Sequence, residues 1–495
     1  MPRGFQYVFS VTPILRTGFV CSLVWAVVVA CAPPEIVEDP FQPVTSHEEY
    51  RSALETLGLD DTELGRSWFA AARTAIDQPM IVETPFEEIV ILDPHHPAAI
   101  GYEFVVRRGR AVTISVDTEL GRYYADLFRV EDARGGDGPV LTMVASRPDD
   151  SPEIRFEPRR DGRYLLRIQP ELLRGGRVSV RIVETASLAF PVEGVGPGAI
   201  WSFFGDGRDG GLRVHEGIDI FAPRGTPLLA ASDALVRTVG VRDRGGNVVS
   251  LYDEERDLLF YYAHLEEQLV EQGERVIAGQ VIGTVGNTGN AITTPPHLHI
   301  GVYQGSWRAA VDPWDYFVDP PLTEPPAPSH ASLAGTWLRL ELDASLRSEV
   351  RAPVVAPRWV NRNPALRRAG AGETMSGRGS SRDDDDVPVP APVRGSTDAG
   401  SVPEGTPLFA VGAAGSLVRV RAPDGREGYV DPSALSSAFD PLVFADAVSL
   451  RHPVTADLVA ELAAGMTVSY LGSTADRVYV KTDSGRVGFV DRADG

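Results

Sequence analysis

The chain has 495 residues, more than one hydrophobic core normally serves, so roughly three or four domains are expected. Hydrophobic residues make up 43% of it and charged residues 23%, proportions that are ordinary for globular proteins and exclude wholesale disorder. The formal net charge is -21 at pH 7 and no basic stripe is present, which excludes a nucleic-acid partner because such partners require clustered lysine and arginine.

Residues 1–30 have the anatomy of a signal peptide, because two arginines accompany an apolar run at 20–30 that is too short to span a bilayer. The run ends in Val28-Val29-Ala30-Cys31, which resembles the lipobox of bacterial lipoproteins. The resemblance implies that Cys31 is lipidated, and Ala32 after it implies an outer-membrane anchor that faces the periplasm. An ordinary secretory signal with an incidental cysteine is the alternative.

Residues 31–84 are expected to form a tether followed by two short helices that pack as a hairpin. Ser46 and Glu49 fit a capping box at the start of the first helix. Apolar residues then recur at helical spacing in two segments, at Tyr50, Leu54 and Leu57 and at Leu64, Trp68, Phe69 and Ile76.

Between residues 85 and 188 the hydrophobic period changes to two, most clearly from Val112 to Val116, which predicts a β-sandwich accessory domain. Residues 189–319 are also rich in predicted strands, and they hold four of the nine histidines. A Pro-rich linker at 320–335 follows, and its composition favours a stiff extended spacer.

The C-terminal third contains an internal repeat, which predicts two small SH3-like β-barrels at 336–440 and 441–495. Eight residues recur at a constant offset: Gly405, Gly412, Val418, Val420, Gly425, Arg426, Gly428 and Val430 reappear as Gly465, Gly472, Val478, Val480, Gly485, Arg486, Gly488 and Val490. Leu346-Arg347 matches Leu450-Arg451 at a larger offset, so the first copy contains an insertion, and the Gly/Ser/Pro-rich stretch 365–402 is expected to be disordered. The copies resemble bacterial SH3-type barrels, which commonly bind cell-wall peptides; an inert spacer is the alternative.

The segment His215-Glu216-Gly217-Ile218-Asp219 is the first candidate metal-binding motif. On an extended strand His215 and Asp219 share one face while Ile218 points to the other. Gly217 between them is expected to leave space for a metal ion.

His297-Leu298-His299 is the second motif, and its spacing of two places both imidazoles on one face of a strand with Leu298 in the core. A further histidine, His264, stands in Tyr262-Ala263-His264-Leu265. Imidazoles and a carboxylate suit zinc, and the spacing alone leaves open how many of these residues bind it.

With these motifs the chain resembles the lysostaphin/LytM-type zinc metallopeptidases. The resemblance rests on segments that follow the order of the family: Gly205 to Gly211, His215-x-Gly217-x-Asp219, Ala222-Pro223-x-Gly225-Thr226-Pro227, Tyr262-Ala263-His264-Leu265, Gly279-Gln280-x-Ile282-Gly283, Gly286-x-Thr288-Gly289 and His297-Leu298-His299. It implies an antiparallel β-sheet zinc peptidase domain in which His215, Asp219 and His299 bind Zn²⁺, with His264 and His297 as the non-ligand catalytic pair. Three protein ligands would keep a fourth position open for water.

The family pattern also implies that His264 and His297 flank the attacking water, one as general base and the other stabilising the oxyanion, and the assignment between them stays open. Glu216 faces away from the metal on a strand, so it is not taken as the base. One departure is the segment 250–254, where many relatives carry a histidine. In the family this loop borders the groove, so the departure bears on substrate preference more than on catalysis.

The sequence therefore predicts a mainly β, multidomain zinc metalloendopeptidase that hydrolyses peptidoglycan cross-links, of the D-alanyl to diaminopimelate type, in the cell envelope. Its expected partners are peptidoglycan, the membrane through the lipid anchor, and envelope proteins that regulate it. One alternative is a non-catalytic wall-binding lipoprotein that activates other wall hydrolases, and another is a structural module with a closed four-ligand zinc site. The presence of both His264 and His297 favours the enzyme, because a regulator needs neither.

Overall fold

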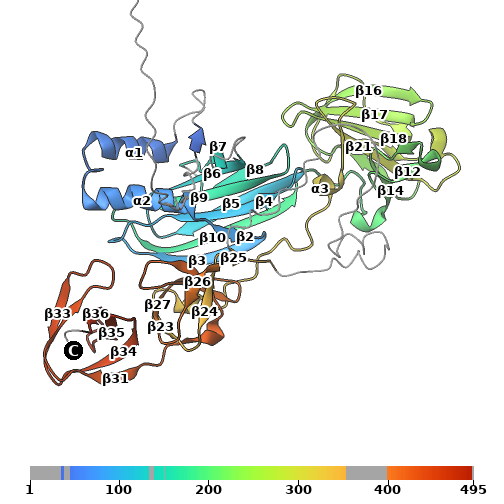
Figure 1. Cartoon of the computed structure of the whole chain (residues 1–495). Coiled ribbons are helices and arrows are strands. Elements are labelled where there is room, and N and C mark those ends of the chain that lie inside the picture. Colours follow the sequence, from blue (N-terminus) through green and yellow to red (C-terminus); the bar gives the residue numbers. More distant parts are fainter. Residues whose placement is uncertain (1–34, 38–44, 133–138, 150, 353–397, 493–495) are drawn as a thin grey trace, which may run out of the picture.

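The computed structural model describes most of the chain, and its architecture is mainly β with several antiparallel sheets, as the sequence predicts (Figure 1). The described residues are 35–37, 45–132, 139–149, 151–352 and 398–492. The predicted signal segment 1–30, the lipidation site Cys31 and residues 365–397 of the predicted loop lie outside them. None of the helices within these ranges is long and apolar enough to cross a membrane.

Two short helices, α1 (Ser46–Thr56) and α2 (Glu63–Asp77), pack against each other, as their apolar spacing predicts (Figure 1). Trp68 of α2 meets Tyr50 of α1 edge-on, with 5.4 Å between the ring centroids. The capping prediction was wrong by one position. Thr45 is the N-cap and its hydroxyl accepts from the Glu48 amide at 3.2 Å, so Ser46 is already the first helical residue.

His47 of α1 is buried with one ring nitrogen unpaired. Its Nε2 donates to Oε1 of Gln169 at 2.8 Å, because the amide nitrogen of Gln169 already donates to the Trp68 carbonyl at 2.8 Å. Nδ1 therefore carries the lone pair, and it has no hydrogen-bond partner among the described residues. Burial, together with the positive charge of Arg167, lowers the pKa of His47 to about 4.

Two sheets pack face to face around one apolar core and form the predicted β-sandwich. The first sheet has the order β1-β7-β6-β9-β4-β2-β25, and the second contains β3-β10-β5-β8. Burial alternates along β3, because successive side chains of a strand point to opposite faces. The strands are β1 (Glu35–Val37), β2 (Met80–Val82), β3 (Phe86–Leu92), β4 (Ile100–Val106), β5 (Arg110–Thr118), β6 (Tyr123–Asp132), β7 (Pro139–Ser146), β8 (Glu153–Phe156), β9 (Gly162–Pro170), β10 (Gly176–Ala186) and β25 (Glu349–Val350).

The histidine motifs lie in a separate central unit, whose main sheet has the order β11-β14-β21-β18-β17-β16-β19. Leu298 of β21 is fully buried beneath this sheet, as the alternation predicted for the second motif requires. In the first motif Ile218 and Ile220 of β14 are also fully buried, but the predicted extended strand is shorter than expected, because His215 and Glu216 lie in the turn before β14. The elements of the central unit are β11 (Ile200–Ser202), β12 (Gly207–Arg208), β13 (Arg213–Val214), β14 (Ile218–Phe221), β15 (Pro227–Leu229), β16 (Ala234–Arg242), β17 (Gly246–Asp253), β18 (Leu258–Gln268), β19 (Arg275–Val276), β20 (Val281–Val285), β21 (His297–Gln304), β22 (Ala310–Val311) and α3 (Trp314–Phe317).

The C-terminal part forms two similar units, as the internal repeat predicts. In both units an early strand pairs with the last long strand at the same place, Arg347 opposite Tyr429 in the first and Arg451 opposite Phe489 in the second. The first repeat unit consists of β23 (Trp337–Leu340), β24 (Ala344–Arg347), β26 (Asp398–Val402), β27 (Pro407–Ala414), β28 (Leu417–Arg421), β29 (Glu427–Val430) and β30 (Leu435–Ser436). The second consists of β31 (Asp440–Val443), β32 (Val448–Arg451), β33 (Leu458–Leu462), β34 (Thr467–Ser473), β35 (Arg477–Lys481) and β36 (Val487–Asp491).

The C-terminal boundary predicted for the disordered loop 365–402 is wrong. Its last five residues form β26, which pairs antiparallel with β24 and places Val402 opposite Ala344. Strand β33 pairs with β32 in the same way in the second repeat unit. The composition of residues 365–402 does not predict β26. Its partner strand β24 lies before the insertion in the sequence, so no local pattern indicates the pairing.

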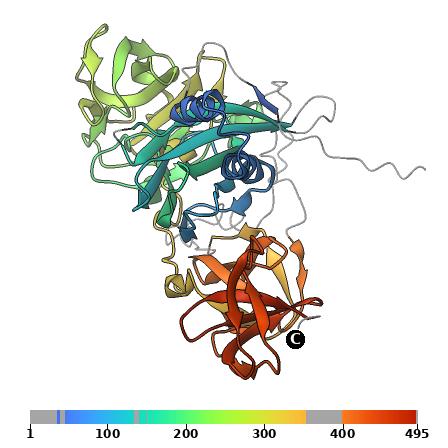
Figure 2. The same cartoon turned by 90° about the vertical axis from the view of Figure 1, so that its left-hand side faces the viewer.

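The Pro-rich segment 320–335 is docked along the molecule and is not a free spacer. Glu324 forms an ion pair with Arg181 of β10, and the Ser329 amide donates to the Gly415 carbonyl at 2.8 Å. Proline composition predicts a stiff extended chain, but it says nothing about contacts that neighbouring polar groups make. Figures 1 and 2 both show the sandwich between the central unit and the repeat units.

The first repeat unit shares a continuous sheet with the sandwich. Strand β27 pairs with β3, with Gly412 opposite Val90. Beside this junction the buried Arg419 forms ion pairs with Glu427 at 2.9 Å and with the sandwich residue Glu88 at 3.3 Å. Burial raises the pKa of Glu88, and Arg419 opposes that shift. One guanidinium therefore pairs with the fully buried Glu88 and with the partly buried Glu427 at the junction.

The free energy of unfolding is expected to fall as the pH drops from 6.5 towards about 4. In this window the His47 side chain of the unfolded chain binds a proton that the folded protein does not bind, so acid favours unfolding. Since one pKa unit corresponds to about 1.4 kcal/mol, His47→Phe should remove on the order of 3 kcal/mol of this pH dependence. Denaturant titrations across the window measure the slope, the exposed His95→Phe is the control, and an unchanged slope in His47→Phe would contradict the assignment.

Arg419→Ala is expected to lower the free energy of unfolding by about 3 to 5 kcal/mol, because it leaves the fully buried Glu88 without its cation. Arg421→Ala is the matched control. Arg421 stands two residues further along the same strand and pairs with Glu427 nearer the surface, so its loss should cost less than about 1 kcal/mol. Urea unfolding of both variants measures the difference, and equal losses would show that the buried network does not hold the junction.

Candidate metal centre and groove

A groove of about 1040 Å³ lies over the polar face of the central sheet. Strands β14, β18 and β21, together with the turn before β14, bring all the predicted site residues to this groove. The residues are His215, Asp219, His264, His297 and His299. Loops around 208–216, 244–245 and 290–294 contribute much of the remaining lining.

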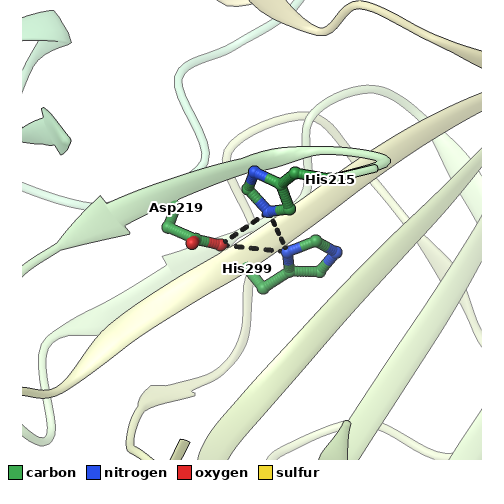
Figure 3. A group of neighbouring side chains, drawn as sticks. All are labelled: His215, Asp219 and His299. Atoms are coloured by element: carbon green, nitrogen blue, oxygen red, sulfur yellow. Dashed lines mark hydrogen bonds and ion pairs between the residues drawn. The ribbon is translucent and has the colours of Figure 1, made fainter. Parts of the chain in front are cut away.

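His215, Asp219 and His299 converge on one point, as Figure 3 shows. Asp219 on β14 stands directly opposite His299 on β21, and its Oδ1 lies 3.0 Å from Nδ1 of His299. His215, in the turn before β14, brings its Nε2 to 3.0 Å from the same oxygen and 2.9 Å from His299 Nδ1. These three side chains form a group that could hold a metal ion.

The protonation of His215 shows why this group suits a cation. Its Nδ1 lies 2.8 Å from the Phe203 carbonyl, and a carbonyl only accepts, so Nδ1 carries the proton and Nε2 a lone pair. That lone pair faces the carboxylate oxygen of Asp219, and two acceptors at this distance repel each other unless a cation lies between them. Around tetrahedral zinc, neighbouring nitrogen and oxygen ligands are separated by about 3.3 Å, close to the spacing observed here.

Asp219 is held as a carboxylate by its surroundings. The second carboxylate oxygen, Oδ2, accepts from Nη2 of Arg208 at 2.8 Å, and Arg208 also donates to Ser202. Arg208 therefore orients Asp219 from behind, as outer-shell partners of metal ligands do.

Gly217 has a different role from the one predicted. A Cβ at this position would lie 2.4 Å from the Ile300 carbonyl oxygen and 2.9 Å from Cε1 of His299. The glycine thus lets the turn between His215 and Asp219 approach β21 closely. It permits the convergence of the side chains and does not simply leave a space for the ion.

His264 and His297 lie beside the group without belonging to it. Their ring centroids are 5.1 Å apart, and that of His264 is 6.1 Å from His299. Each Nδ1 lies 2.9 Å from a backbone carbonyl, of Thr288 for His264 and of Pro295 for His297. Both Nδ1 atoms therefore carry the proton and both Nε2 atoms have a lone pair. Burial lowers the pKa of His264 to about 4, so its imidazole is neutral at pH 7.

A backbone irregularity aims His264 at the groove. Its φ is 67°, a left-handed value that is uncommon outside glycine. The pairing of β17 with β18 shifts register at this point, and the His264 amide donates to the Gly245 carbonyl at 2.7 Å. Such a bulge redirects a side chain, which explains how Ala263 and His264, though consecutive, both line the groove.

Two features of the site differ from the sequence interpretation. Arg208 was missed, and its only signal was its position in the glycine-rich segment 205–211. The segment 250–254 does not border the groove. It belongs to β17 and the following turn, where Arg256 pairs with Glu157 of the sandwich at 2.7 Å. The groove is lined instead by Arg244 and Gly245 at the other end of the β16–β17 hairpin.

Residues 213–313 match the model of Peptidase family M23. The matched segment contains the whole metal-binding group together with His264 and His297. By fold and site the central unit is therefore similar to the M23 peptidases.

Particular relatives are similar to the chain over this part only. The chain is 42% identical over 90 residues to the peptidoglycan DD-endopeptidase ShyC of Vibrio cholerae, covering 18% of this chain and 20% of that protein. Its identity to the L-Ala–D-Glu endopeptidase of Bacillus subtilis is 37% over 125 residues, covering 23% and 38%. The chain thus spans well under two thirds of either relative. The catalytic domain of lysostaphin from Staphylococcus simulans is 33% identical, covering 23% of this chain and 87% of that one, with a TM-score of 0.22.

The full chain is expected to bind about one equivalent of Zn²⁺, and Asp219→Asn should lose most of it because the carboxylate supplies the negative charge of the group. Metal content after dialysis against a weak chelator measures this. Glu216→Gln is the control, since Glu216 contacts Tyr303 at 3.4 Å instead of the metal-binding group. Full retention of zinc by Asp219→Asn would show that these three residues are not the ligands.

Proposed function

We propose that this chain is a zinc-dependent endopeptidase that hydrolyses peptide cross-links of bacterial peptidoglycan. The observation that carries the proposal is the convergence of His215, Asp219 and His299 beside two further histidines with unprotonated Nε2 atoms. The match to Peptidase family M23 supports it, as do the relatives in Vibrio cholerae and Bacillus subtilis, which are named endopeptidases.

In this proposal His215, Asp219 and His299 hold the zinc ion. Bound zinc supplies Lewis acidity, which polarises the scissile carbonyl and lowers the pKa of water towards neutrality. The chain's own residues move the protons. His264, neutral and fixed by the Thr288 carbonyl, can take a proton from the attacking water at Nε2. His297 is fixed in the same way, and once protonated at Nε2 either imidazole can donate to the oxyanion or to the leaving amine.

The proposed setting is the cell envelope, with the chain anchored through a lipid on Cys31 and facing the periplasm. The repeat units, as SH3-type barrels, would hold the enzyme against the wall. Cleavage between D-alanine and diaminopimelate is the bond that this setting favours, and the relative in Vibrio cholerae is named a DD-endopeptidase. Fatty-acid labelling of the full-length chain, lost in Cys31→Ala, tests the anchor.

Incubation of the zinc-loaded mature chain with cross-linked muropeptides should convert dimers to monomers, and a chelator should abolish the reaction. His297→Ala should lower kcat by about 10²- to 10⁴-fold, because it removes a proton-transfer group and leaves the metal group intact. Chromatography of the products gives the rate and the bond that is cut.

His452→Ala, a histidine in the second repeat unit, is the control and should keep wild-type activity. If dimers persist at saturating zinc while the chain still binds intact wall material, the chain is a wall-binding or regulatory protein and not an endopeptidase.

A further inference from the structure

Arginines line the groove of an otherwise strongly acidic chain. The formal net charge is -21, yet Arg208, Arg213 and Arg244 all contribute to the lining. The carboxylates in the lining are Glu216 and Asp219, and Asp219 belongs to the metal-binding group. The groove outside the metal centre is therefore complementary to an anionic ligand.

Arg244 differs from Arg208 in the partners of its guanidinium group. Arg208 is engaged by Asp219 and Ser202. Arg244 is exposed, and within the described part of the chain no hydrogen bond or ion pair engages its guanidinium. Its donors are free to bind a ligand in the groove, and a guanidinium fits the two oxygens of a carboxylate.

The backbone of Arg244 is fixed relative to the catalytic pair. Its carbonyl accepts from the Asn290 amide at 2.9 Å, and the next carbonyl, of Gly245, accepts from the His264 amide at 2.7 Å. A Cβ on Gly289 would lie 2.3 Å from the Arg244 carbonyl oxygen, so the two loops are in close contact. The hairpin tip thus has a defined position beside His264.

We propose that Arg244 determines substrate specificity by binding a free carboxylate of the peptide close to the scissile bond. The inference rests on the proposed function and adds the chemical class of substrate, an anionic stem peptide whose carboxylate is not amidated. Arg244 acts in binding, since it holds the carboxylate while His264 and His297 act on the scissile bond. Exposed apolar side chains of the groove, Trp201 and Leu212, suit the alkyl parts of such a peptide.

The test compares cleavage of a muropeptide dimer that has a free stem carboxylate with that of the matched carboxamide, by the zinc-loaded full chain. The wild type should prefer the acid by about tenfold in kcat/KM, since charge-assisted hydrogen bonds are roughly twice as strong as neutral ones. Arg244→Gln should remove the preference by raising KM for the acid and leave the amide unchanged, and Arg244→Lys should restore part of it. Arg242→Gln, at the end of β16 and outside the lining, is the control.

Affinity for both dimers is measured in parallel on the metal-free chain, where no turnover occurs. Tighter binding of the acid that depends on Arg244 supports the subsite even if the zinc-loaded wild type cleaves neither dimer, and in that case the proposed function alone fails. Equal binding and cleavage of acid and amide by the wild type, or an equal loss for both in Arg244→Gln, overturns the role of Arg244.

Discussion

The register of β14 against β21 is the constraint on which the site depends. It places Asp219 opposite His299 and Phe221 opposite His297. A slip of one residue would turn the polar side chains of one strand into the core and its apolar ones to the groove. The fully buried Ile220 and Leu298, a directly opposed pair beneath the sheet, prevent that slip. Burial of these two side chains in the hydrophobic core therefore fixes the register that places Asp219 opposite His299.

Backbone carbonyls then set the protonation of the site. Phe203, Thr288 and Pro295 each accept from the Nδ1 of one histidine, and each carbonyl belongs to a segment outside the long strands. A carbonyl cannot donate, so in all three imidazoles the remaining nitrogen, Nε2, faces the groove with a lone pair. The hydrogen bond from Nδ1 to a carbonyl thus leaves Nε2 of His215 free to bind a metal ion, and it leaves Nε2 of His264 and His297 free to accept a proton. The surrounding loops orient the site as much as the strands position it.

The sequence predicts the parts of the site that follow from a two-residue period and fails where the backbone departs from it. Spacing was sufficient to pair His215 with Asp219 and His297 with His299, because these residues lie on strands or beside them. The family resemblance, and not spacing, joined the two pairs into one site. His264 lies at a bulge, and only the family resemblance placed it in the groove. Arg208 and Arg244 stand in loops whose course depends on distant partners, and no local pattern identifies them. The joining of β27 to β3 was missed for the same reason, since it pairs residues more than three hundred positions apart.

That junction changes what the repeat units can do. A Pro-rich linker alone would let them sample many positions, and wall binding would then raise the local concentration of substrate over a broad region. Here the sheet continues from the sandwich into the first repeat unit, and Glu88 and Arg419 are buried across the junction. The linker contacts Arg181 of β10 and Gly415 of the first repeat unit. On the other side Arg110 of β5 bonds to Asp315 and Val318 of the central unit. If the repeat units bind the wall as proposed, these contacts would hold the groove in one orientation relative to the bound wall. The proposed enzyme would then favour cross-links that lie at that one position over others nearby.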